Sequence, residues 1–131
     1  MRGAMGVRVL IVDDSKLARM AVARTLSVLR PDWSRVEATN SDEALALTHQ
    51  QAFDIALVDF NMPGRDGLAL AADLRDACPD MPIALISANV QLEIVDRAKA
   101  IGAKFLPKPL TEEAMRAFIA TAEQQIAEQR G

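Results

Sequence analysis

Polar side chains that could carry out chemistry follow four apolar runs of this chain. Asp59 comes directly after the apolar residues 55–58 and before a loop rich in proline and glycine. Ligands of open parallel sheets bind outside the carboxyl ends of the strands, so a carboxylate at this position is available for chemistry. Three other apolar runs end in a similar way: Asp13 and Asp14 follow 7–12, Ser87 follows 83–86, and Lys108 lies just beyond 103–106.

Three of these side chains are carboxylates, and their convergence favours a bound divalent cation. Closely spaced carboxylates raise one another's pKa unless a cation intervenes. Mg²⁺ prefers oxygen ligands and binds through one or two carboxylates together with a phosphate. The backbone carbonyl of Asn61, two residues beyond Asp59, offers a further oxygen. The sequence therefore predicts a site for Mg²⁺ (or Mn²⁺) formed by Asp13, Asp14, Asp59 and this carbonyl.

Asp59 beside such a cation is suited to accept a phosphoryl group. Carboxylates attack phosphoryl groups to form aspartyl-phosphates. Because the transition state is loose, the protein mainly positions the acceptor and neutralises the phosphoryl oxygens. Lys108 can pair with Asp59 or with a phosphoryl oxygen, and Ser87 can donate one hydroxyl hydrogen bond. These residues predict phosphoryl transfer to Asp59.

The composition is typical of one cytoplasmic domain. The chain has 131 residues, half of them apolar, which is enough for one sizeable core. A net charge of −3 argues against a nucleic-acid partner, which would need clustered positive charge. We expect no membrane association, since no apolar stretch is long enough to span a bilayer. The single cysteine, Cys78, fits a reducing cytoplasm.

The domain is expected to cover residues 7–127. Residues 1–6 show no periodicity and are interpreted as a flexible start or a remnant of cloning. The polar residues 128–131 are expected to fray.

Apolar periodicity predicts strands that alternate with helices. Ser41 and Thr111 are the expected N-caps of the second and last helices. The alternation predicts an α/β fold, with a doubly wound, five-stranded parallel sheet of the flavodoxin-like (βα)5 type and strand order 2-1-3-4-5. The expected strands are 7–12, 35–39, 55–59, 83–86 and 103–106, and the expected helices are 17–29, 41–50, 67–77, 91–100 and 111–126.

Over residues 6–127 the chain resembles the receiver domain of two-component response regulators, in its CheY-like single-domain form. The order and spacing of the matching motifs make this resemblance specific. The motifs are VDDS at 12–15, DFNMPGRDG at 59–67, SA at 87–88 and KP at 108–109.

The resemblance implies a role for each site residue. Asp59 would accept a phosphoryl group from a histidine kinase or a histidine phosphotransfer protein. Ser87 and Lys108 would contact that group, and a cis Lys108–Pro109 bond would aim the lysine inward. Phe105 matches the switch aromatic, which moves inward when Ser87 is drawn towards the phosphoryl group. The family often has Thr at the position of Ser87 and Tyr at the position of Phe105. Ser87 keeps the hydroxyl of the usual threonine, whereas Phe105 lacks the hydroxyl of the usual tyrosine.

The resemblance also implies an output by protein binding. Phosphorylation would bias the surface formed by the fourth helix, the fifth strand and the fifth helix. An unknown downstream protein, or a second copy of the chain in a phosphorylation-dependent homodimer, would read this state. Because no output segment follows the last predicted helix, we expect the output in another molecule or in sequence absent here.

Two other functions remain open at this stage. An aspartyl-phosphate-dependent phosphatase or phosphomutase would place an acid two residues after its nucleophile, but Asn61 has no such proton. A receiver-like scaffold would work without phosphorylation, although all the site residues are present. Each residue also has a structural reading: Asp13 and Asp14 as helix caps, Ser87 as a strand-end hydroxyl, Lys108 as a solvated lysine, and Phe105 as core.

Overall fold

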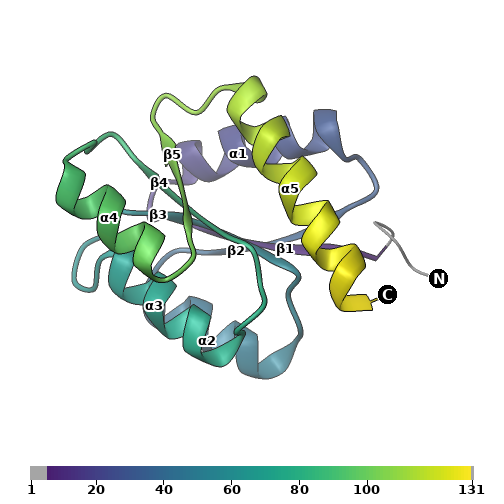
Figure 1. Ribbon diagram of the computed structural model, residues 1–131, viewed down its shortest axis with the longest axis horizontal. Coiled ribbons are helices and arrows are strands. Elements are labelled where there is room, and N and C mark those ends of the chain that lie inside the picture. The colour runs from purple at the N-terminus through teal and green to yellow at the C-terminus, as the bar shows by residue number, and fades with distance from the viewer. Residues whose placement is uncertain (1–5, 131) are drawn as a thin grey trace.

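The computed structural model describes residues 6–130, which form a parallel sheet between two layers of helices (Figure 1). The strand order is β2-β1-β3-β4-β5, so the expected flavodoxin-like α/β fold is confirmed. The strands are β1 (Arg8–Val12), β2 (Ser34–Ala38), β3 (Ile55–Asp59), β4 (Ile83–Ser87) and β5 (Lys104–Pro107). The helices are α1 (Lys16–Leu29), α2 (Ser41–Gln50), α3 (Gly67–Ala77), α4 (Leu92–Ala100) and α5 (Glu112–Arg130).

The two faces of the sheet are covered by different helices. Helices α1 and α5 lie on one face, and α2, α3 and α4 lie on the other (Figure 1). Every residue of β3 and of β4 is buried. Strands covered on both faces need apolar side chains in both directions, which explains their continuous apolar sequences. The two polar residues of these strands, Asp59 and Ser87, stand at their carboxyl ends.

The expected N-cap of α2 at Ser41 is wrong, because Asn40 occupies that position. The side chain of Asn40 accepts a hydrogen bond of 2.8 Å from the backbone N–H of Glu43. Ser41 is instead the first helical residue, and its buried hydroxyl donates to the Arg65 carbonyl. The cap expected at Thr111 is confirmed, since its hydroxyl accepts a 3.0 Å hydrogen bond from the Ala114 N–H.

Helix α5 continues past the point where we expected fraying. It ends at Arg130, whose guanidinium lies 2.8 Å from a carboxylate oxygen of Asp54. Gln129 also donates a side-chain hydrogen bond to the Asp80 carbonyl. Contacts with distant segments therefore hold the last turn in place. Residues 1–5 of the expected flexible start, and residue 131, lie outside the described residues.

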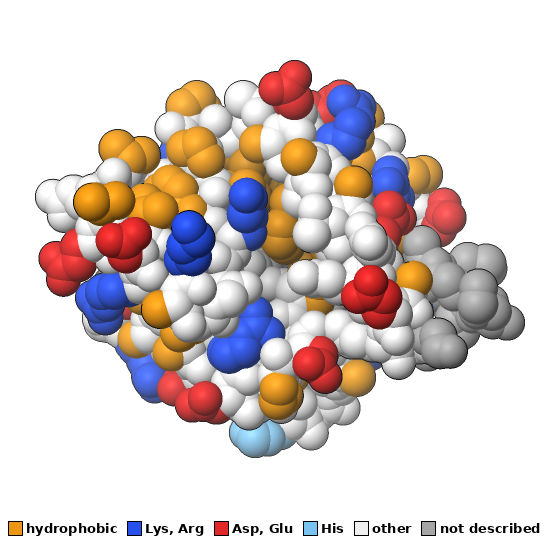
Figure 2. Space-filling model, in the orientation of Figure 1, with side chains coloured by type: hydrophobic (Ala, Val, Ile, Leu, Met, Phe, Trp, Pro, Cys, Tyr) orange, Lys and Arg blue, Asp and Glu red, His pale blue; other side chains and the backbone are white. Residues whose placement is uncertain are grey.

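Charged side chains of both signs are distributed over the face seen in Figure 2, with apolar side chains between them. Within residues 6–130, no helix combines the length and the apolar character needed to cross a membrane.

Candidate functional site

The register of the sheet places the four polar strand ends side by side. Val12 pairs with Val58, so the next residue of each strand brings Asp13 beside Asp59. Ser87, at the end of β4, pairs with Pro107 of β5, and Lys108 follows. The carboxyl edge of the sheet therefore collects the groups that the sequence predicts to converge.

Three carboxylates form a cluster at this edge. One carboxylate oxygen each of Asp13, Asp14 and Asp59 lies within 4.8 Å of the other two. Asp59 is 2% exposed and Asp13 is 6% exposed, whereas Asp14 faces solvent. Two buried carboxylates and one accessible carboxylate form an oxygen-rich donor set of the kind that a hard divalent cation prefers.

The ammonium group of Lys108 pairs with Asp59. Lys108 Nζ lies 2.5 Å from Asp59 Oδ1, and about a third of the lysine side chain is exposed. Within residues 6–130 this buried oxygen receives no well-directed hydrogen bond, so its contact with Lys108 is an ion pair. A buried oxygen with unused lone pairs is able to bind a cation or form a bond. The Lys108–Pro109 peptide bond is cis, as expected.

Burial is the main reason that two of the carboxyl groups have raised pKa values. Loss of hydration raises the pKa of Asp59, while the adjacent ammonium group of Lys108 partly offsets this. Burial also raises the pKa of Asp13, with a smaller contribution from the charge of Asp59. The sequence predicts raised values through mutual repulsion, but desolvation is the larger cause.

Asp13→Asn is expected to stabilise the metal-free protein at neutral pH. Because the pKa of Asp13 is raised by folding, the folded protein binds this proton more tightly than the unfolded chain does. The free energy of unfolding therefore falls as pH rises from about 4 through the raised pKa, and the cost is greatest above that pKa. Asparagine removes that cost and keeps an oxygen for the Ser15 N–H, which bonds Asp13 Oδ1 at 2.9 Å.

Urea denaturation in EDTA across a pH series measures this effect. At pH 7 the free energy of unfolding of Asp13→Asn should exceed that of wild type by more than about 0.5 kcal/mol, which is the usual range for a surface substitution. The gain should shrink as pH falls towards 4. Asp96→Asn, on the exposed face of α4, is the matched control and should change the free energy of unfolding little. A gain that is independent of pH would contradict the assignment to Asp13 ionisation.

Ser87 and Phe105 lie on neighbouring strands near this cluster. The Ser87 side chain is fully buried, and its Oγ accepts a 2.9 Å hydrogen bond from the Asn89 N–H. Phe105 pairs with Leu85 in the sheet and is partly buried. It lines a groove of about 550 Å³ between β5 and α5. Asn61 is exposed, and its backbone N–H bonds to the Asp59 carboxylate.

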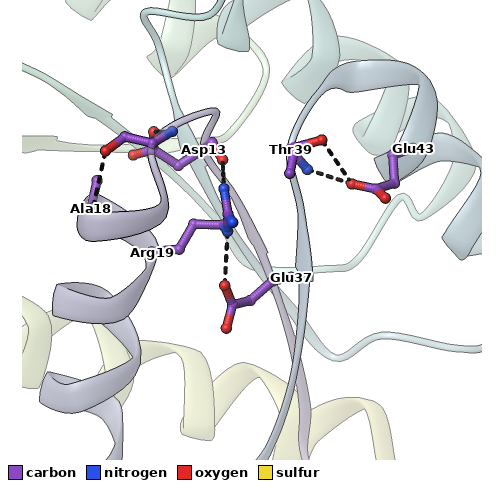
Figure 3. A network of polar contacts seen from close by, with 7 residues as sticks. Asp13, Ala18, Arg19, Glu37, Thr39 and Glu43 are labelled. Carbon is purple, nitrogen blue, oxygen red and sulfur yellow. Dashed lines mark hydrogen bonds and ion pairs between the residues drawn. The ribbon is translucent and has the colours of Figure 1, made fainter.

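Sequence reasoning missed Arg19, which belongs to the surroundings of the acidic cluster. Its guanidinium donates to the backbone carbonyl of Asp13 at 2.7 Å and to Glu37 of β2 at 2.8 Å (Figure 3). The only signal in the sequence is a basic residue about one turn into α1, and such residues are common on helix surfaces. The contact with a carbonyl across the β1–α1 connection could not be foreseen from spacing.

Known proteins resemble this chain in sequence. The family model for the response regulator receiver domain matches residues 9–120. The positive alginate biosynthesis regulatory protein of Pseudomonas aeruginosa is 40% identical over 112 residues, which cover 82% of this chain and 43% of that protein. The sensor protein EvgS of Escherichia coli is 32% identical over 117 residues, which cover 88% of this chain and 10% of that protein. The chain thus spans less than half the length of these curated relatives.

A solved structure shows the same fold. The chemotaxis protein CheY4 of Vibrio cholerae superposes with a TM-score of 0.80 at 28% sequence identity. The match covers 89% of this chain and 98% of that protein chain. Sequence and structure comparisons therefore point to one family.

Proposed function

Because this chain belongs to the response regulator receiver domain family, we propose that Asp59 accepts a phosphoryl group from a phosphohistidine of a sensor kinase or phosphotransfer protein. One observation carries the proposal. The buried Asp59 carboxylate lies at a strand end, close to two further carboxylates and 2.5 Å from the Lys108 ammonium. This combination of a nucleophile, a cation-binding donor set and a fixed positive charge suits phosphoryl transfer.

In this reaction a carboxylate oxygen of Asp59 forms a bond to phosphorus while the bond from phosphorus to the donor histidine nitrogen breaks. The released imidazole keeps the bonding electron pair and takes up a proton. Lys108 already pairs with Asp59, so its ammonium is close enough to pair with a phosphoryl oxygen once the carboxylate is phosphorylated. The hydroxyl of Ser87 can supply a further donor, since within residues 6–130 its oxygen accepts from the Asn89 N–H and its proton has no recorded acceptor.

The acidic cluster fits a divalent cation. Asp13, Asp14 and Asp59, together with the backbone carbonyl of Asn61, would hold Mg²⁺ (or Mn²⁺). When bound, the cation would neutralise charge on the carboxylates and on the phosphoryl oxygens. Asp13 is already oriented for this role by the Ser15 N–H, which donates to its Oδ1.

Phosphorylation then changes partner binding through the face formed by α4, β5 and α5. Movement of Ser87 towards the phosphoryl group would free space for Phe105, which lies on the adjacent strand. Phe105 lines the groove between β5 and α5, where Figure 2 shows apolar side chains beside basic ones. Lys99 and Lys104 also line this groove. A downstream protein, or a second copy of the chain, that prefers the phosphorylated state would carry the signal onward.

An aspartyl-phosphate-dependent phosphatase is disfavoured by the residue two positions beyond Asp59. That residue is Asn61, whose amide cannot protonate a leaving group. We therefore propose a signalling module that promotes only its own phosphorylation and dephosphorylation.

Treatment with acetyl phosphate tests the proposed function. We expect intact-protein mass spectrometry to show the addition of one phosphoryl group when Mg²⁺ is present, and none after chelation with EDTA. A folded protein that remains unlabelled with Mg²⁺ would support the receiver-like scaffold instead. Rapid multiple-turnover hydrolysis of phosphomonoesters would support the phosphatase.

A further inference from the structure

Asp13 lies in the connection between β1 and α1, where three hydrogen bonds hold it. The Asp13 N–H donates to the Ala38 carbonyl of β2 at 3.1 Å, and the Ser15 N–H donates to Asp13 Oδ1 at 2.9 Å. The third bond is made by Arg19, whose Nη1 donates to the Asp13 carbonyl at 2.7 Å. The first two bonds come from the backbone, so Arg19 is the side chain that completes the set (Figure 3).

The carbonyl that Arg19 contacts belongs to the peptide unit between Asp13 and Asp14. A peptide unit is planar, so a bond to its oxygen restrains the backbone rotation on both sides. Arg19 therefore restrains the directions in which both side chains leave the backbone. The restraint matters most for Asp14, because this residue is exposed to solvent. Its carboxylate nevertheless lies beside those of Asp13 and Asp59 in the cluster.

The guanidinium itself is held in place from the other side. Its Nε donates to Glu37 at 2.8 Å, and only 12% of the Arg19 side chain is exposed. One rigid, planar group thus joins α1, the end of β1 and β2. A lysine at this position would present a single nitrogen, which cannot make both contacts with this geometry.

We propose that Arg19 is a positioning residue for the divalent-cation site, acting through the peptide unit that carries Asp13 and Asp14. This inference rests on the proposed function, because it requires that the acidic cluster binds Mg²⁺. Groups outside the immediate ligand set typically contribute ten- to a hundredfold to metal affinity when they orient the ligands. Arg19 touches neither the phosphoryl acceptor nor a carboxylate of the cluster in any contact that the structure shows.

Isothermal titration calorimetry with Mg²⁺ tests the proposal on the folded protein. We expect Arg19→Ala to weaken Mg²⁺ binding about tenfold or more. The Mg²⁺ affinity of Arg19→Lys should lie between those of Arg19→Ala and wild type. If the alanine variant does not fold, a loss of affinity in Arg19→Lys tests the proposal in its place. Glu37→Gln keeps an acceptor oxygen for Arg19 and should bind Mg²⁺ more tightly than Arg19→Ala does.

Arg30→Ala is the matched control at the other end of α1. Arg30 makes a partly exposed ion pair with Glu123 at 2.7 Å, so its loss should lower thermal stability without altering the affinity for Mg²⁺. If Arg19→Ala also lowers only the melting temperature and binds Mg²⁺ as wild type does, the inference is wrong while the proposed function stands. If wild type itself binds no Mg²⁺, both are overturned.

Discussion

Asp59→Ala is expected to reduce covalent phosphorylation to background while the fold is retained. The substitution removes the acceptor oxygen that pairs with Lys108, and alanine offers no group that could form a bond to phosphorus. Folding should survive because the buried, charged carboxylate is itself costly, as its raised pKa indicates. The measurement is intact-protein mass spectrometry after acetyl phosphate and Mg²⁺, together with circular dichroism to confirm the helical content.

Two further variants separate chemistry from general damage. Asp59→Asn keeps the shape of the side chain but is a poor nucleophile, so it should also remain unlabelled. Asp76→Ala removes an exposed carboxylate from α3 and should be labelled as wild type is. Stoichiometric labelling of Asp59→Ala would show that another residue is the acceptor. The exposed Asp14 would then be the first to examine, because it belongs to the same cluster.

The convergence of the acidic cluster could be predicted because it depends on topology alone. Parallel strands end at one edge of the sheet, so residues that follow β1 and β3 must be neighbours once these strands pair. The contact of Arg19 with the Asp13 carbonyl depends on the rotamer of a long side chain and on Glu37 of another strand. The cause of the raised pKa values could not be ranked either, since burial depends on the complete packing around each carboxylate.

In the fold, too, local patterns could be predicted from the sequence, whereas contacts between distant segments could not. The expected helix 67–77 agrees with α3 (Gly67–Ala77). Its apolar residues recur at helical spacing, Gly67 marks its start, and Pro79 follows its end. Asn40 and Ser41 are both good N-cap residues, and the choice between them is made by the burial of Ser41 against the loop that contains Arg65. The polar sequence after 127 predicts fraying. In the structure, Arg130 forms an ion pair with Asp54, which directly precedes β3.

Gly67→Ala is expected to destabilise the protein by about 3 kcal/mol or more, because the position has no space for a side chain. A Cβ atom at Gly67 would lie 2.0 Å from the Asp59 carbonyl oxygen and 2.8 Å from the Phe60 Cα. Both are backbone atoms of the β3 end, and the Gly67 N–H bonds to the Phe60 carbonyl at 2.9 Å. The loop therefore folds back onto the strand that carries Asp59. Alanine favours helices over glycine by up to about 1 kcal/mol, which is too little to offset this clash.

Urea denaturation of Gly67→Ala beside Gly64→Ala separates lack of space from backbone strain. Gly64 lies in the same loop with φ of +78°, and a Cβ there would have no neighbour within 4 Å. Its replacement should cost only the left-handed backbone conformation, about 1 kcal/mol. Equal losses in the two variants would mean that the loop yields at Gly67. A much larger loss for Gly67→Ala would show that close packing against the Asp59 backbone fixes the strand end, and with it the position of Asp59.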